Sequence, residues 1–193
     1  GVLTMWELRG RVKEFFAFVF VLVLGVFGFF MSMDLFFLFV WFDVSLFPMY
    51  PLIAIWGTTR KEYGALKLFL HVLAGSALVL PGIVYIAVAS GLNTFDILAL
   101  MQPGALTPGQ QKFAFFLFYI GFGILAGVWP FHTWSPVGHV AAPTSVSMIH
   151  AGVLMKVGAF GILRVGIFLC PLGWEYWAPL MAILATIGII YGI

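Results

Sequence analysis

Charged residues are scarce in this sequence of 193 residues. Only 8% of them are Asp, Glu, Lys or Arg, against about 25% in an ordinary soluble domain. So few charged side chains cannot cover the surface of a water-soluble particle of this size. The scarcity excludes a soluble enzyme, a nucleic-acid-binding domain and a disordered tail, and a net charge of +2 gives no reason to expect an acidic partner.

Cysteine is nearly absent as well. Cys170 is the only one, so a disulfide framework and a cysteine-ligated metal cluster are excluded. The sequence also has no nucleotide-binding loop and no His or Cys pattern typical of haem, iron–sulfur or zinc sites. We therefore expect no cofactor and no redox centre in this chain.

Long hydrophobic runs are what the sequence does contain. Hydrophobic residues make up 63% of the chain and aromatic residues 18%. A spanning helix needs about 20 mainly apolar residues, and a helix satisfies its backbone polar groups within the segment, as lipid requires. The sequence therefore predicts an all-α, polytopic membrane protein. Its expected spans are 14–32, 34–56, 64–89, 112–133, 143–169 and 174–193.

Basic residues predict the orientation in the membrane. Arg9, Arg11 and Lys13 precede the first span, and Arg60 and Lys61 follow the second, so both clusters lie on one side. The positive-inside rule makes that side cytoplasmic. The long connection between the third and fourth spans then lies outside. We expect a multi-pass protein, in a bacterial inner membrane.

Two charges fall in the middle of predicted spans. Asp43 lies near the centre of the second span and Lys156 near the centre of the fifth. Each costs about 2.5–3.5 kcal/mol on insertion scales, and such residues commonly mark ion or proton pathways. The alternative is a structural ion pair that holds the helices together.

Further titratable groups lie in the spans. Lys67 and His71 are one turn apart in the third span and share a face, while His132 ends the fourth span and His150 lies in the fifth. Imidazole accepts and donates protons near neutral pH, as a relay requires. The alternatives are ordinary packing for each histidine and snorkelling to the membrane surface for Lys67.

Helix-breaking residues accompany these groups. Pro48 follows Asp43 by five residues and removes one backbone hydrogen bond. Gly121, Gly127 and Pro130 weaken the second half of the fourth span. Broken helices at membrane depth are tolerated where they line a polar or hydrated cavity. Simple kinking for packing is the alternative.

Several segments resemble a known family. Residues 47–57 (FPMYPLIAIWG) and 129–136 (WPFHTWSP) are similar to conserved blocks of the antiporter-like subunits of respiratory complex I. Residues 60–70 and 151–164 (AGVLMKVGAFGILR) are most similar to subunit M (chain 4) of NADH–quinone oxidoreductase. The resemblance covers nearly the whole chain.

The resemblance implies a longer parent built from two inverted five-helix repeats. This chain would be a fragment that holds the first repeat, the family's helices four to eight with a broken helix, and the start of the next helix. It would be a subunit of a proton-translocating NADH–quinone oxidoreductase, partnered by neighbouring antiporter-like subunits. NADH, FMN, iron–sulfur clusters and quinone would be held by partner subunits.

The resemblance also assigns roles to single residues. Asp43 stands where the family has a Glu on its helix five, Lys156 is the helix-eight lysine, and Lys67 is the helix-six lysine, which is still available to pair with Asp43. Two positions depart from the pattern: Leu125 stands where the family has the helix-seven lysine, and Val137 replaces a common Asp.

The predicted function is proton translocation from the cytoplasm to the outside through buried Asp, Lys and His residues, coupled to electron transfer elsewhere. We hypothesise that His71 or His150 substitutes for the missing lysine as a relay base, with His132, Lys67, Asp43 and Lys156 along the pathway. Two rivals are a subunit of a multisubunit Na⁺/H⁺ antiporter and a subunit of a membrane-bound hydrogenase. A purely structural membrane anchor would need no charges at mid-membrane.

Overall fold

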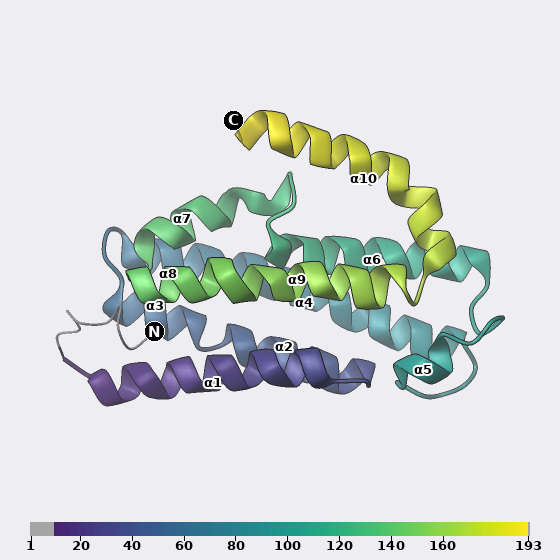
Figure 1. Cartoon of the computed structure of the whole chain (residues 1–193), viewed down its shortest axis with the longest axis horizontal. Helices are drawn as coiled ribbons and strands as arrows, with labels where there is room; N and C mark the ends of the chain where they lie inside the picture. The colour runs from purple at the N-terminus through teal and green to yellow at the C-terminus, as the bar shows by residue number, and fades with distance from the viewer. Residues whose placement is uncertain (1–9, 193) are drawn as a thin grey trace.

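The computed structural model describes residues 10–192. Within that range the chain forms six segments that are long and apolar enough to cross a membrane, and they run back and forth side by side (Figure 1). These segments are α1 (Val12–Met31), α2 with α3 (Leu35–Leu46 and Met49–Trp56), α4 (Lys61–Ala89), α6 with α7 (Pro108–Ala126 and Trp134–Ala141), α8 with α9 (Thr144–Ile149 and Met155–Gly161), and α10 (Pro171–Gly192). The all-α membrane fold predicted from the sequence is confirmed.

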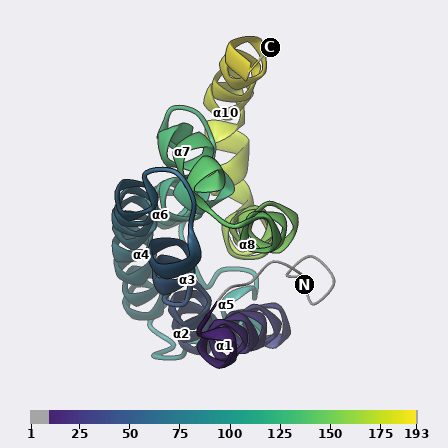
Figure 2. The same ribbon diagram turned by 90° about the vertical axis from the view of Figure 1, so that its left-hand side faces the viewer.

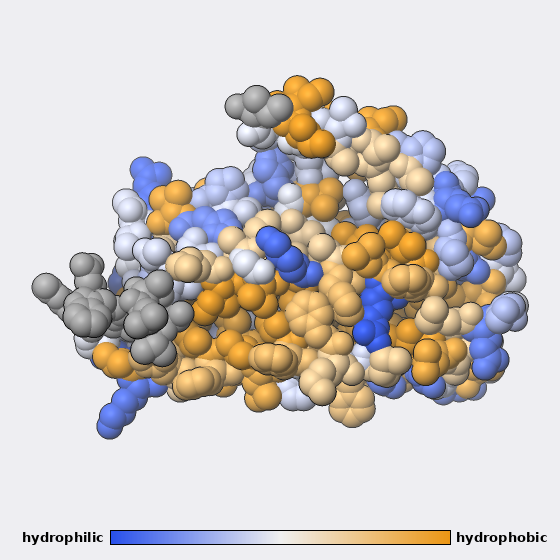
Figure 3. Space-filling model, in the orientation of Figure 1, coloured by the Kyte–Doolittle hydropathy of each residue, from blue (hydrophilic) through white to orange (hydrophobic). Residues whose placement is uncertain are grey.

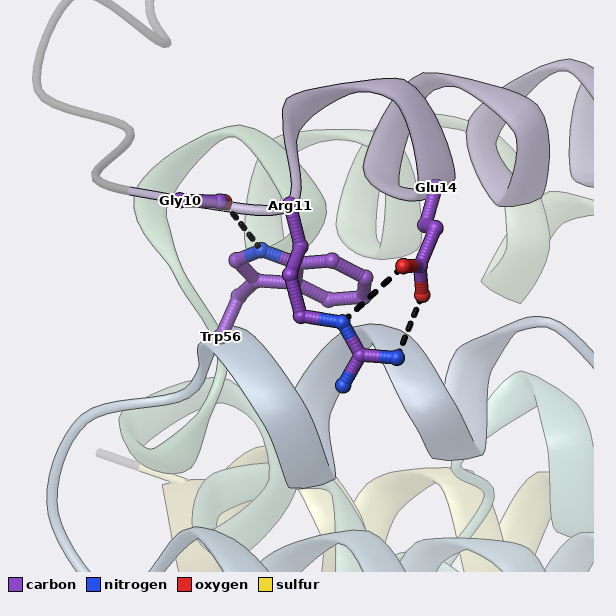
Figure 4. A network of polar contacts seen from close by, with 4 residues as sticks. All are labelled: Gly10, Arg11, Glu14 and Trp56. Atoms are coloured by element: carbon purple, nitrogen blue, oxygen red, sulfur yellow. Dashed lines mark hydrogen bonds and ion pairs between the residues drawn. The ribbon is translucent and has the colours of Figure 1, made fainter.

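The start of α1 is anchored to the end of α3. Arg11 forms an ion pair with Glu14 one turn later, with 2.5 Å between their closest atoms. The indole Nε1 of Trp56 donates to the carbonyl of Gly10 across 3.3 Å (Figure 4). These contacts place the first basic cluster beside the end of the second span. Arg9, also predicted to belong to that cluster, lies outside the described residues.

The second span is two helices instead of the single one expected over 34–56. Asp34 caps α2, because its Oδ1 accepts hydrogen bonds from the backbone N–H groups of Phe36 and Phe37. The helix is interrupted at Phe47 and Pro48, where the proline has no N–H to donate. Both residues keep right-handed backbone angles, so α3 continues in nearly the same direction as α2.

The prediction that the fourth span covers 112–133 is wrong at both ends, since the span runs from Pro108 to Ala141. α6 begins at Pro108, where Thr107 and Gln110 form a capping box, and it stops at Ala126. Gly127 has a φ of +75°, a conformation that glycine adopts without strain. A short turn follows, and α7 then extends to Ala141. The residues 134–136, which were expected to separate two spans, therefore lie inside α7.

The fifth and sixth spans also differ from expectation in detail. The fifth, expected over 143–169, runs from Thr144 to Ile167 and contains two π-helical segments, His150–Leu154 and Ile162–Ile167. α10 begins at Pro171, before the expected start at 174. The third span, expected from 64, begins at Lys61.

Helix α6 lies at the centre of the packing. It contacts α4, α9 and α10, and α10 projects from the rest of the bundle (Figure 2). Small residues allow the close approaches: a Cβ on Gly158 would lie 2.6 Å from the carbonyl oxygen of Phe122. The break between α6 and α7 therefore begins next to helices that carry the titratable residues.

The surface agrees with a membrane environment. The face in Figure 3 is mainly hydrophobic, with hydrophilic residues at both ends and a few isolated ones near its middle. On the side of the α1–α2 turn, α5 (Ile97–Leu100) lies in the long connection. Asp34 and Asp96 form an isolated antiparallel β-bridge there, which ties this connection to the start of α2.

Candidate functional site

The carboxylate of Asp43 is held by α4. Asp43 is half-buried on α2, about one turn before the Pro48 interruption. The hydroxyl of Ser76 donates a hydrogen bond to Asp43 Oδ1 across 2.6 Å. Ser76 is only 3% exposed, so this bond forms inside the bundle. A cavity of about 180 Å³ opens beside Asp43, and the other side chains that line it are apolar: Leu46, Phe47, Leu68, Phe69, Val72 and Leu73.

No cation among residues 10–192 pairs with Asp43. The only ion pair within 4.0 Å among residues 10–192 joins Arg11 to Glu14. The pairing of Lys67 with Asp43, which the resemblance left open, is therefore not formed in this structure. The ammonium of Lys67 instead lies 5.9 Å from the centre of the Tyr63 ring, towards the beginning of α4. This position fits the snorkelling alternative for Lys67.

His71 is engaged with its own helix. Its Nδ1 donates to the backbone carbonyl of Lys67 across 2.9 Å. The ring is half-buried on α4, and the ring contacts found in the described part of the chain do not join it to another histidine. The structure therefore separates His71 from His150, the other predicted relay base.

The second part of the site is a stack of three aromatic rings, two of which are titratable histidines. We call it the histidine stack, and it consists of Trp134, His150 and His139. His150 lies between the other two, with ring centres 5.1 Å from Trp134 and 4.6 Å from His139. His150 is 1% exposed and its Nδ1 has no hydrogen-bond partner. His139 Nδ1 lies 2.8 Å from the hydroxyl of Ser147. The two imidazole planes are 24° apart and no hydrogen bond joins them, so a proton would pass between them through a bridging water, to which each nitrogen can accept or donate.

Lys156 adjoins the histidine stack. Its ammonium donates to the carbonyl of Ala151 across 2.6 Å, and Ala151 belongs to the π-helical segment that begins with His150. π-Helical turns are frequent at functional sites. Lys156 is exposed. It does not pair with Asp43, so the structural ion pair between these two charges is absent.

Leu125 lies at the break, where the resemblance would have a lysine. It is 1% exposed, in the last turn of α6. The indole Nε1 of Trp134 donates to the carbonyl of the neighbouring Ile124 across 2.8 Å. This bond ties α7 back to the end of α6 and holds the histidine stack next to the break. An apolar side chain therefore occupies the point where α6, α7 and the stack meet.

His132 occupies a separate position. It lies in the short turn between α6 and α7, and its ring meets Tyr191 of α10 edge-on at 5.1 Å. Both residues line a cavity of about 590 Å³ between the break and α10. The Nδ1 of His132 is buried without a hydrogen-bond partner. The structure thus places His132 at the break, with a different neighbour from the histidine stack.

Sequence reasoning did not select Ser76, His139 or Trp134 as site residues. The signal for His139 was present, because it follows the Trp-Pro-containing motif and lies eleven residues before His150. Ser76 carried no such signal, because a serine in an apolar helix usually bonds its own backbone. Only the arrangement of α2 and α4 reveals its contact with Asp43.

Comparison with known proteins identifies the family. Residues 32–193 match the family described as NADH:quinone oxidoreductase/Mrp antiporter, transmembrane. NADH-quinone oxidoreductase subunit M of Rhodobacter capsulatus is 35% identical over 98% of this chain. The chain belongs to this family. The resemblance stated from the sequence motifs is confirmed, down to the similarity with subunit M.

Solved structures agree with this membership of the NADH:quinone oxidoreductase/Mrp antiporter family. A chain of respiratory complex I from Thermus thermophilus superimposes with a TM-score of 0.81, at 26% identity over 93% of this chain. A chain of an archaeal membrane-bound sulfane sulfur reductase has a TM-score of 0.84 at 22% identity, which shows a common fold. The chain spans 39% of the Rhodobacter relative and 38% of the Thermus chain.

Proposed function

We propose that this chain is part of a proton-translocating membrane subunit of a respiratory quinone oxidoreductase, and that it conducts protons through the histidine stack and Lys156. The observation that carries the proposal is the buried imidazole of His150. It stacks on His139, has an unpartnered Nδ1, and begins a π-helical segment of a membrane-spanning helix. A packing role alone does not need an unpartnered polar atom, whereas a proton carrier needs a free lone pair or proton.

The chemistry of the stack supports this role. In this proposal a proton passes from Lys156 to His139 and then to His150 through bridging water, because each neutral imidazole has one accepting nitrogen. The donation from Trp134 to Ile124 keeps the stack in place at the break. Asp43 on α2 provides a second proton-binding group. Movement of a charge at one group alters the proton affinity of the others, because Coulomb interactions are strong in a medium of low polarity.

The redox chemistry belongs to other subunits in this proposal. The Rhodobacter relative is named as a subunit of NADH-quinone oxidoreductase, and no three His, Cys, Asp or Glu side chains among residues 10–192 gather as metal ligands. NADH, FMN, iron–sulfur clusters and quinone would then lie in partner subunits. Neighbouring antiporter-like subunits would pack against this one in the membrane.

The test compares three single substitutions in the full-length protein within its native complex: Lys156→Ala, His150→Phe and His71→Ala. We expect Lys156→Ala and His150→Phe to lower the number of protons pumped per NADH oxidised by tenfold or more, and His71→Ala to leave that ratio nearly unchanged. His150→Phe preserves the ring stacking but removes the titratable nitrogens. Normal pumping in His150→Phe would contradict the relay through the stack.

The second candidate is a subunit of a multisubunit cation/proton antiporter, since the family name includes Mrp antiporters. A purified complex that oxidises NADH with quinone would exclude it. Na⁺-driven proton movement without any electron donor would exclude the redox-coupled function instead.

A further inference from the structure

The partner of Asp43 is a hydroxyl where a cation was expected. No Lys, Arg or His nitrogen among residues 10–192 lies within 4.0 Å of the Asp43 carboxylate. The contact that replaces it is the 2.6 Å hydrogen bond from Ser76, a side chain that is 3% exposed. A carboxylate inside a membrane needs a hydrogen-bond donor when it is ionised. Ser76 is therefore the group that makes the ionised form of Asp43 tolerable at this position.

The hydroxyl of Ser76 donates to a side chain on another helix, instead of to a backbone carbonyl of its own helix as is usual for a serine. Such a hydroxyl normally donates to a carbonyl three or four residues earlier on its own helix. Ser45 does this, because its hydroxyl donates to the carbonyl of Phe42 across 2.6 Å. Both serines are buried, yet only Ser76 reaches across to another helix. The difference indicates that the geometry between α2 and α4 orients Ser76 towards the carboxylate.

The neighbouring glycine keeps Ser76 in place. A Cβ on Gly75 would lie 2.7 Å from the carbonyl oxygen of Gly121, so α4 and α6 are in close backbone contact there. Tight packing of this kind limits rotation and sliding of α4. The hydroxyl of Ser76 is thus presented from a rigid part of the bundle, beside the cavity of about 180 Å³ that Asp43 lines.

A hydroxyl differs from an ammonium in one chemical respect. It donates to an ionised carboxylate, and it keeps a hydrogen bond to the carboxyl group after protonation, because it can also accept. We propose that Ser76 is the positioning residue of a proton-binding site centred on Asp43 and takes the place of a cationic partner. This inference rests on the proposed function, since it assumes that Asp43 takes up and releases protons.

Other titratable groups near Asp43 are few. α2 packs against α1, α3 and α4. From Phe15 to Met31, α1 has no charged side chain, and α3 has only Tyr50 as a titratable group. On α4, His71 and Lys67 lie five and nine residues before Ser76, which is about 7.5 and 13.5 Å along the helix axis.

The experiment uses Ser76→Ala, Ser76→Thr and Ser45→Ala in the full-length protein within its native complex. The first removes the hydroxyl, the second keeps it, and the third removes a matched buried hydroxyl that does not touch Asp43. The readouts are the pH profile of proton pumping and the infrared carbonyl band of protonated Asp43, which is assigned by its loss in Asp43→Asn.

Loss of a donor to the ionised carboxylate favours the protonated form. We therefore expect Ser76→Ala to move the titration midpoint of the Asp43 band upward by about one pH unit, a tenfold change in proton affinity, with a parallel shift of the pumping profile. Ser76→Thr and Ser45→Ala should leave both midpoints in place. An unmoved midpoint in Ser76→Ala, or an equal shift in Ser45→Ala, would overturn the inference.

Further variants separate this inference from the proposed function. If Asp43→Asn pumps normally, Asp43 is not on the pathway and both proposals about it fail. If Asp43→Asn abolishes pumping while Ser76→Ala has no effect on either midpoint, only the role of Ser76 fails. A shift of the Asp43 band in Lys67→Ala or His71→Ala, without one in Ser76→Ala, would show that Lys67 or His71 is the partner of Asp43 instead of Ser76.

Discussion

Cys170 lies between the fifth span and α10, with none of its surface exposed. Burial raises the pKa of its thiol from the ordinary value of 9.0 to about 12. The thiolate is the reactive form, so the thiol stays protonated at pH 8 and reacts slowly. We expect no labelling of Cys170 by N-ethylmaleimide at pH 8 in the folded protein, and complete labelling after denaturation in dodecyl sulfate, as measured by intact mass.

A matched control makes this test informative. Gln102 is exposed in the long connection, so Gln102→Cys should be labelled within minutes under the same conditions. The thiol ionises from about pH 9 in the unfolded chain but stays protonated up to about pH 12 in the folded one, so the stability of the folded state falls as the pH rises from 9 to 12. Rapid labelling of Cys170 at pH 8 would show that the start of α10 opens in solution.

At the residue scale, the sequence predicted positions better than partners. Asp43, His150 and Lys156 stand out because lipid disfavours charged and polar groups, and the structure places all three beside other polar groups. Ser76, and not Lys67, is the partner of Asp43, because the orientation of α4 about its own axis decides which of its side chains faces α2. The spacing of residues along one helix does not predict how that helix is oriented against its neighbour.

At the scale of the element, small residues set the distances between helices. A Cβ on Gly158 would lie 2.6 Å both from the backbone nitrogen of Ala126 and from the carbonyl oxygen of Phe122. Backbone atoms of α6 cannot move aside as a flexible side chain can. We expect Gly158→Ala to lower the free energy of unfolding by about 1–3 kcal/mol through overpacking, as measured by thermal denaturation in detergent.

Gly152 is the control for Gly158, because it lies on the same span and a Cβ there would meet nothing within 4 Å. Gly152→Ala should therefore leave the stability unchanged or raise it slightly. An equal loss in both variants would mean that helix α9 does not pack on α6 at Gly158.

The broken helix also predicts a measurable role for one hydrogen bond. Trp134→Phe keeps an aromatic ring against His150 but removes the donor to the buried carbonyl of Ile124. An unsatisfied buried acceptor costs about 1–3 kcal/mol, so the melting temperature should fall. Trp177→Phe removes a comparable 3.0 Å bond to the carbonyl of Lys112 at a half-buried site. We expect a smaller loss there, and a larger one would contradict the tethering role of Trp134.

The sequence predicted that the fourth span is weakened, but not where it breaks. Gly121, Gly127 and Pro130 all looked capable of interrupting the helix. The structure continues α6 through Gly121, which fits against α4, and stops it before Gly127, whose φ is +75°. Whether a glycine serves close packing or a left-handed turn is decided by its neighbours in space. The sequence did not predict α7 for a separate reason: its eight residues, which include Ser, Pro and Gly, resemble a loop in composition.

At the scale of the whole molecule, the distribution of charge predicts how the protein lies in the membrane. The described basic residues Arg11, Lys13, Arg60 and Lys61 lie at one end of the bundle, where the chain enters α1 and passes from α3 to α4 (Figure 1). The connection that contains α5 lies at the other end. The positive-inside rule predicts that the basic end faces the cytoplasm. Lys156 and Asp43 then lie between the two aqueous phases, as a proton pathway requires.

This orientation is tested by two single cysteines introduced in a Cys170→Ser background. Thr59, between α3 and α4, and Gln102, after α5, are both exposed. These two connections lie at opposite ends of the bundle (Figure 1). We expect a membrane-impermeant maleimide to label Gln102→Cys from outside in intact cells, and to label Thr59→Cys only after the cells are opened. Lysed cells, in which both should react, control for accessibility. The reverse pattern would invert the direction of the proposed pathway, because the Lys67 end of α4 would then open to the outside instead of the cytoplasm.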